Sequence, residues 1–182
     1  DDFSINNNWI GETIKKVQFK IDVLSENFKS DEGELMIKGK NLFFDYLERK
    51  DRKNFKGWFK TGDLCKLKNS KVFLIGRTDN QLNIGGEKVH AEKIEAIIEK
   101  GKNVKECICF QTKDKTLLNK IVCLIKIRKM GNFIKFKKLI LKRFKNFPAY
   151  YKPAILKFLD NLPKTNNGKK LRNQKELAKL YL

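Results

Sequence analysis

Hydrophobic and polar residues alternate along the N-terminal part of the chain, which predicts strands. The alternation over residues 13–23 is imperfect but typical of a strand, and a turn over residues 31–34 leads into an apolar strand at residues 35–37. Residues 58–75 have the pattern of a β-hairpin with its tip at residues 69–70. These strands are too few to close a sheet by themselves.

From residue 91 onward the apolar period becomes helical. Residues 91–100 place their isoleucines on one face of a helix, with Gly101 as the expected C-cap. A second amphipathic helix is expected over residues 133–146, and Pro148 stops it. The remaining elements are strands at residues 104–110, 121–127 and 154–158 and a last helix through residues 176–180. This order predicts a small α+β domain of about a hundred residues.

Composition limits the class of protein. The 182 residues suffice for one ordinary domain or two small ones. No stretch approaches the roughly 20 apolar residues of a membrane span, and the start lacks the regions of a secretion signal, so a cytoplasmic protein is expected. The four cysteines have no Cys-x-x-Cys spacing, which predicts reduced, buried thiols and no metal site: Cys65, Cys107, Cys109 and Cys123.

The formal net charge of +20 would suit a nucleic-acid or anionic partner. Only six of the 41 basic residues are arginines, however. Arginine is the residue that recognises bases and makes bidentate hydrogen bonds to phosphates. The lysine excess is therefore interpreted as nucleotide-composition bias of the genome. No specific nucleic-acid partner is expected.

Three motifs follow one another along the chain: GWFKTGDL at residues 57–64, GRTDNQLNIGGEKVH at 76–90 and LPKTNNGKKLR at 162–172. In this order they resemble the closing third of the adenylate-forming ligases, the acyl-CoA synthetase and AMP-binding family. The resemblance implies that residues 1–78 are the C-terminal part of a large core domain and complete a β-barrel subdomain. It implies that residues 79–182 are a C-terminal lid domain with a β-hairpin and a three-stranded sheet packed by helices.

The resemblance assigns the adenylation lysine to Lys169. In the family, the lysine of this motif contacts the substrate carboxylate and the α-phosphate as the acyl-adenylate forms. A lysine ammonium on a flexible stem after a glycine turn suits that task, because it is a movable point charge. The neighbouring Lys170 is the less suitable candidate by its spacing from Gly168. Without the motif, Lys169 would be an ordinary solvated lysine.

Nucleotide contacts are expected at Asp63 and Arg77. A carboxylate can accept hydrogen bonds from both hydroxyls of a ribose, and a guanidinium can bridge ribose and phosphate. The resemblance gives these roles to the two residues and places the hinge between the domains at Asp79. Taken alone, Asp63 and Asp79 would pass as ordinary turn residues.

The segment from Gly85 to Lys88 is the expected loop of the thioester step. The resemblance implies that Gly85 and Gly86 line the tunnel for the acceptor thiol, with Glu87 and Lys88 beside them; a plain hairpin corner is the alternative. Lys88 replaces the arginine common in the family. His90 is expected to flank the start of a helix rather than act as a base.

The resemblance implies an ATP-dependent, AMP-forming acid–thiol ligase that uses ATP, Mg2+ and a carboxylic acid, with CoA as acceptor. The chain lacks the family's phosphate loop, so by itself it is expected to be inactive and to need the remainder of the core domain, which would bind most of the Mg2+. Three alternatives stay open. They are an adenylation domain that charges a phosphopantetheinyl carrier protein, a non-catalytic basic nucleic-acid-binding module and a regulatory remnant of a ligase.

Overall fold

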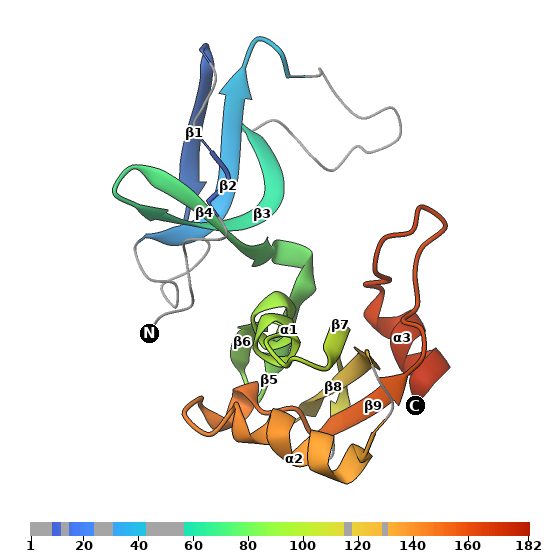
Figure 1. Cartoon of the computed structure of the whole chain (residues 1–182). Coiled ribbons are helices and arrows are strands. Elements are labelled where there is room, and N and C mark those ends of the chain that lie inside the picture. Colours follow the sequence, from blue (N-terminus) through green and yellow to red (C-terminus); the bar gives the residue numbers. More distant parts are fainter. Residues whose placement is uncertain (1–8, 12–14, 24–30, 43–56, 115–117, 129–130) are drawn as a thin grey trace. The chain divides into compact units, whose positions relative to one another are not determined.

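The computed structural model describes residues 9–11, 15–23, 31–42, 57–114, 118–128 and 131–182. The chain divides into two compact units, Asp1–Asp79 and Asn80–Leu182. Among the described residues, the first unit contains a β-sheet, and the second contains helices together with two small sheets (Figure 1).

The first unit contains a four-stranded antiparallel sheet in the order β1-β2-β3-β4. Its strands are β1 (Val17–Asp22), β2 (Glu32–Gly39), β3 (Phe59–Lys68) and β4 (Lys71–Arg77). Over the described residues the sheet is open, with β1 and β4 at its edges. Its core is a small cluster of Leu35, Cys65 and Val72, against which Phe19, Ile21 and Ile37 pack.

The hairpin between β3 and β4 confirms the expected tip. Asn69 and Ser70 have φ values of 50° and 61°, as a two-residue turn of the hairpin type requires. The prediction of a turn over residues 31–34 is wrong, because β2 already begins at Glu32. Gly33 pairs with Cys65 of β3, and a Cβ there would lie 2.3 Å from the carbonyl oxygen of Asp22. Pairing on both sides outweighs the turn preference of glycine.

The second unit begins with a two-stranded hairpin and continues into a three-stranded sheet, in which β7 and β8 are antiparallel and β8 and β9 are parallel. Its elements are β5 (Gln81–Ile84), β6 (Glu87–His90), α1 (Ala91–Glu99), β7 (Val104–Asp114), β8 (Leu118–Ile127), α2 (Phe133–Lys142), the 3-10 turn η3 (Ala149–Tyr151), β9 (Ile155–Leu159) and α3 (Gln174–Tyr181). The parallel pair needs a crossover, which α2 supplies.

Both α1 and α3 pack on β7. Side chains alternate between the faces of a strand, so Ile108 and Phe110 point to one face and the cysteines of β7 to the other. Ile108 and Phe110 join the cluster with Leu177 of α3. On α1, Ile94 and Ile98 are fully buried. The expected α+β fold, with a hairpin and a three-stranded sheet packed by helices, is confirmed.

Two helix ends differ from the prediction. The second helix ends at Lys142 rather than near residue 146, and turns continue the chain to Pro148. The C-cap of α1 is Lys100 and not Gly101, because the Lys100 N–H still bonds to Ala96 O with helical torsions. None of the helices in the described part of the chain is long and apolar enough to cross a membrane.

Candidate functional site

Asp63 and Arg77 lie opposite each other on the paired strands β3 and β4. The Arg77 guanidinium donates through Nη1 to Asp63 Oδ1 at 3.0 Å and to the carbonyl oxygen of Thr61 at 3.3 Å. It also donates through Nε to Asp79 Oδ1 at 3.1 Å and through Nη2 to Asp79 Oδ2 at 3.4 Å. The structure therefore brings together the two expected nucleotide contacts and the expected hinge residue.

Electrostatics keep this arginine charged. The hydrogen bond to Asp79, together with the charges of Asp79 and Asp63, raises the pKa of Arg77 although partial burial opposes it. The side chains of Arg77 and Asp63 remain 41% and 35% exposed, so both stay accessible to a ligand. Because two carboxylates hold the Arg77 guanidinium, its position is fixed before any phosphate or ribose binds.

Gly62 makes this close approach of strands and side chains possible. Its φ is +76°, and a Cβ there would lie 2.8 Å from Arg77 Nη2. Its N–H donates to the buried Glu34 carboxylate at 3.1 Å, and its carbonyl oxygen accepts from Thr78 Oγ1 at 3.2 Å. The Thr-Gly-Asp motif is thus anchored on both sides of the glycine.

Asp79 lies in a short 3-10 turn, η2 (Thr78–Asn80), that joins β4 to β5. The two compact units meet in sequence at Asp79 and Asn80. A few backbone torsions in such a connection can absorb a rotation of one domain. The hinge role of Asp79 stays a prediction.

Gly85 and Gly86 form the two-residue turn between β5 and β6, with φ values of 61° and 89°. Positive φ at both positions is the requirement of the commonest tight hairpin turn, which explains the glycine pair locally. Both glycines and the following Glu87 and Lys88 are exposed. The turn is therefore available at the surface of the second unit, and its role in a thioester step stays a prediction.

Lys169 lies in a second hairpin, between β9 and α3. A bridge pairs Lys164 with Lys170, Thr165 N donates to Lys169 O at 2.8 Å, and Gly168 N closes the turn on Thr165 O at 2.8 Å. Gly168 has a φ of +75°, a conformation that glycine adopts without strain. Figure 1 shows this connection, in red-orange, extending away from the body of the second unit.

The environments of Lys169 and Lys170 are opposite. Lys170 is partly buried and donates to Glu99 Oε1 at 2.9 Å and to Cys107 O at 2.7 Å. Lys169 is exposed, and within the described part of the chain no hydrogen bond or ion pair of its ammonium group is found. Of the two lysines, Lys169 is the one able to meet a ligand.

Glu95 is a functional candidate that the sequence reasoning missed. Its carboxylate, only 3% exposed, accepts from Arg172 Nη1 and, at 2.9 Å, from Arg172 Nη2. A signal was present in the sequence. Glu95 follows Ala91 by four residues and precedes Ile98 by three, so a carboxylate stands in the apolar stripe of an amphipathic helix. Such a charge needs a buried partner.

The cysteines confirm the expectation of reduced, buried thiols, since all four are free and buried. Strand pairing, however, brings Cys107, Cys109 and Cys123 together, with sulfurs within 4.8 Å of one another. Among the described residues this is the one group of His, Cys, Asp and Glu side chains close enough to hold a metal ion. Soft sulfur ligands do not suit Mg2+, so these residues do not fit that ion.

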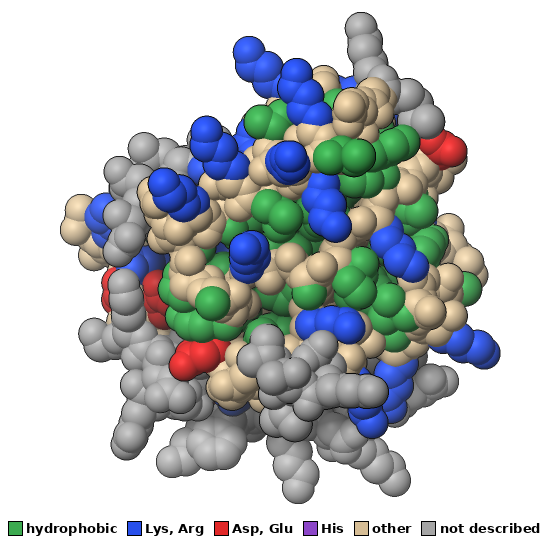
Figure 2. All heavy atoms as spheres, turned by 90° about the horizontal axis from the view of Figure 1, so that it is seen from below, with side chains coloured by type: hydrophobic (Ala, Val, Ile, Leu, Met, Phe, Trp, Pro, Cys, Tyr) green, Lys and Arg blue, Asp and Glu red, His purple; other side chains and the backbone are tan. Residues whose placement is uncertain are grey.

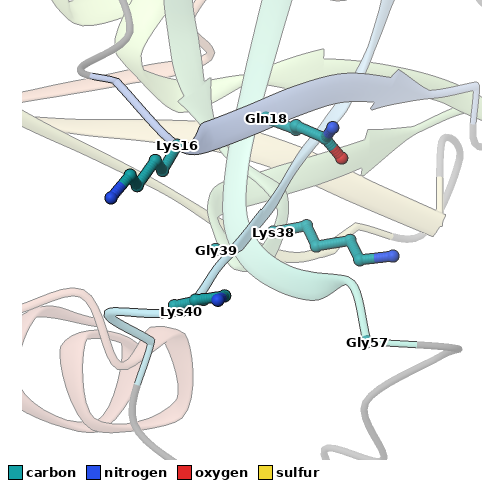
Figure 3. A pocket seen from close by; sticks show the side chains of 6 residues that line it. All are labelled: Lys16, Gln18, Lys38, Gly39, Lys40 and Gly57. Atoms are coloured by element: carbon teal, nitrogen blue, oxygen red, sulfur yellow. The ribbon is translucent and has the colours of Figure 1, made fainter.

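The first unit also has a recess, and none of the candidate site residues lines it. It is lined by Lys16, Gln18, Lys38, Gly39, Lys40 and Gly57. Figure 3 shows the ammonium groups of Lys16 and Lys38 pointing away from each other rather than converging. The recess therefore lacks the convergent donors of an anion site.

Comparison with known proteins finds similarity to one family of enzymes. Residues 93–169 match the model of the AMP-binding enzyme C-terminal domain. The D-alanine–D-alanyl carrier protein ligase of Staphylococcus haemolyticus is 28% identical over 156 residues, which are 81% of this chain and 32% of that protein. The chain thus spans about a third of the length of the relatives it matches.

Solved structures show the same fold. The o-succinylbenzoate CoA synthetase of Bacillus subtilis, in complex with its acyl-adenylate, has a TM-score of 0.80 at 24% identity and covers 96% of this chain and 37% of its own. An amide bond synthetase of Marinactinospora thermotolerans has a TM-score of 0.77 at 14% identity, with the same coverage. In sequence and in fold, the chain is similar to the C-terminal portion of the adenylate-forming ligases, as its three motifs predicted.

Proposed function

We propose that the protein to which this chain belongs joins a carboxylic acid to a thiol in two steps, using ATP. In the first, a carboxylate oxygen attacks the α-phosphorus of ATP, the bond to the pyrophosphate leaving group breaks, and an acyl-adenylate forms. In the second, the thiol sulfur attacks the acyl carbon, AMP leaves with the electrons of the mixed anhydride bond, and the thiol proton goes to solvent or a base.

The observation that carries the proposal is the hairpin of Lys169. Its backbone hydrogen bonds fix the turn, Gly168 takes the positive φ, and the exposed ammonium group follows directly. A charge presented in this way can stabilise the negative charge that develops on the carboxylate and α-phosphate oxygens during transfer. The neighbouring lysine is already engaged and is not available for this role.

Asp63 and Arg77 are the proposed nucleotide contacts. Asp63 would accept hydrogen bonds from the ribose hydroxyls, and Arg77, which already bonds to Asp63, would bridge ribose and phosphate. Mg2+ would offset charge on the ATP phosphates. The described residues offer no suitable set of ligands for this ion, so its site would belong mainly to the remainder of the core domain.

The turn at Gly85 and Gly86 is the proposed loop of the second step. It stands on a different hairpin of the same unit from Lys169, so a rotation about Asp79 would exchange one for the other at the active site. The acid that such an enzyme activates is not encoded in these residues, because the motifs contact groups common to all acyl-adenylates.

The proposal is tested by carboxylate-dependent ATP–pyrophosphate exchange on the full-length protein that contains this sequence, with a panel of acids. We expect Lys169→Ala to lower exchange by about a hundredfold or more, the loss typical of removing one preorganised charge contact in a transition state. Thioester formation from supplied acyl-adenylate should largely survive, since that step does not need Lys169.

Lys179→Ala is the matched control, because Lys179 is also an exposed lysine of the second unit. It should exchange at the wild-type rate. Exchange that is insensitive to Lys169→Ala, or absent with every acid, would show that the motif has no adenylation role.

CoA is the first acceptor we propose, and a phosphopantetheinylated carrier protein is the second. The similarity to ligases named for a D-alanyl carrier protein supports the second, and the fold shared with CoA synthetases fits the first. An acceptor assay with the same acyl-adenylate and either CoA or a loaded carrier protein separates them. The preferred acceptor is the one with the higher kcat/KM.

A further inference from the structure

Glu95 is a buried carboxylate, and its hydrogen-bond partners explain why it is buried. Besides Arg172, it accepts from the backbone N–H of Cys109 at 2.8 Å. Glu99, one turn later on α1, accepts from the N–H of Cys107 at 2.8 Å. Because β7 is an edge strand of its sheet, these N–H groups lack a strand partner, and the two carboxylates fill that place.

The residues that reach these carboxylates come from the segment just after Lys169. The Arg172 guanidinium donates two hydrogen bonds to the Glu95 carboxylate. The Lys170 ammonium donates to Glu99 and lies 3.7 Å from Glu95 Oε2. Between them, Leu171 packs against the hydrophobic cluster on the other face of the sheet, and its N–H bonds to Pro163 O at 3.0 Å. The base of the Lys169 hairpin is thus held by α1, β7 and the core at once.

The charges of this group, which we call the α1 clamp (Glu95, Glu99, Lys170 and Arg172), balance one another, and Glu95 is its buried member. Burial raises the pKa of Glu95, and the hydrogen bonds and charge of Arg172 oppose that rise. Burial alone would lower the pKa of Arg172, but its hydrogen bonds with Glu95, together with the charges of Glu95 and Glu92, outweigh burial and raise it. Loss of either partner would leave the other buried and uncompensated.

We propose that the α1 clamp positions Lys169 for adenylation: it fixes the base of the hairpin, so that the ammonium group at the exposed end arrives in one geometry. This inference rests on the proposed function of Lys169. Glu95 and Arg172 are positioning residues that touch neither substrate nor reacting atoms. Since a displacement of about 1 Å can cost a hundredfold in rate, a hairpin without its anchor loses most of the benefit of its lysine.

A double-mutant cycle on ATP–pyrophosphate exchange tests the inference, using the full-length protein that contains this sequence. Arg172→Gln in the wild-type background should lower kcat by about tenfold or more with little change in the KM for ATP. In the Lys169→Ala background, the same substitution should cause no further loss, because Arg172 acts only through Lys169. Arg172→Lys should rescue only part of the rate, since it keeps the charge but loses the fork.

The controls separate positioning from folding. Arg143→Gln removes an exposed arginine of the same unit, outside the clamp, and should leave exchange unchanged. Glu99→Gln removes a less buried member of the clamp and should give a smaller loss in the same direction. Thioester formation from supplied acyl-adenylate should stay near the wild-type rate in all these variants, whereas a folding defect would lower both half-reactions.

Each outcome decides one claim. Additive losses from Arg172→Gln and Lys169→Ala, or equal losses in both half-reactions, would overturn the positioning role and leave the proposed function standing. A Lys169→Ala variant with full exchange would overturn the proposed function, and the positioning role with it.

Discussion

Single residues set the geometry of the predicted nucleotide contacts, and Gly62 is the clearest case. Its φ is positive, and a Cβ there would lie 2.8 Å from Arg77 Nη2, so a side chain at this position would displace the guanidinium. In the Thr-Gly-Asp motif, the expected nucleotide contact is the aspartate, Asp63. Here the glycine determines whether the arginine can reach that aspartate.

We predict that Gly62→Ala lowers the free energy of unfolding of the first unit by more than Gly57→Ala does. The φ of Gly62 is +76° and that of Gly57 is +79°, so both variants bear the left-handed backbone cost of about 1–2 kcal/mol. Only the Gly62 variant also displaces Arg77, since a Cβ at Gly57 meets Lys38 at an ordinary 3.6 Å. Urea denaturation followed by tryptophan fluorescence measures the difference.

That probe is suited to the first unit, because both tryptophans of the chain, Trp9 and Trp58, belong to it. Equal losses for the two glycine variants would show that Arg77 moves aside without cost, and that the tight approach is incidental.

Among the elements, the junction of β6 and α1 carries a buried histidine at the helix N-cap. Burial, with a contribution from the charge of Lys93, lowers the pKa of His90 to about 4. The native state therefore keeps His90 neutral, while the unfolded chain binds a proton near the ordinary histidine pKa of about 6.5. The expected role of a helix-flanking residue is consistent with this neutral, 4% exposed side chain.

The consequence is a pH dependence of stability. Stability from His90 is fully present above about pH 6.5 and is lost as the pH falls toward 4, because the unfolded state takes up the proton first. We predict a loss of up to about 3 kcal/mol across this range. Urea denaturation at several pH values, followed by far-ultraviolet circular dichroism, reports it, since all α-helices of the described residues lie in the second unit.

His90→Asn is the control, because asparagine can cap a helix and does not titrate in this range. Its stability should fall less between pH 6.5 and pH 4 than that of the wild type. Parallel curves for the two proteins would assign the pH dependence to the carboxylates instead.

For the whole molecule, the net charge of +20 is a property of composition more than of a built surface. Figure 2 shows one face on which Lys and Arg side chains stand apart among hydrophobic and other atoms rather than in a continuous stripe. Two arginines are tied to carboxylates, Arg77 to Asp63 and Arg172 to Glu95. A base-reading surface would need such arginines free.

We therefore predict binding to nucleic acid that depends on charge alone. Two unrelated DNA duplexes should bind this chain with affinities within about twofold of each other, and both affinities should fall steeply as salt rises. Lys169→Ala should leave them unchanged within the same margin, since it removes one charge of many. Fluorescence anisotropy titrations at several salt concentrations measure this, and a clear preference for one duplex would revive the nucleic-acid-binding alternative.

The sequence by itself determined the order of elements and the motif residues. Period-two and helical patterns located the strands and helices. The turns at residues 69–70 (Asn-Ser) and 85–86 (Gly-Gly) were correctly placed at hairpins or corners, because these features are local. The errors were local too: the start of β2 and the ends of α1 and α2 depend on pairing and packing with neighbours that a sequence window does not contain.

Only the tertiary structure decided which residues meet. Glu95 and Arg172 are 77 positions apart, and Lys170 reaches Cys107 across 63, so no spacing rule could pair them. The three cysteine sulfurs likewise come together through strand register rather than through a motif. The conformation of a turn depends on the residues within it, so the sequence predicts it. A buried charge needs a partner of opposite charge, and that partner can come from anywhere in the chain.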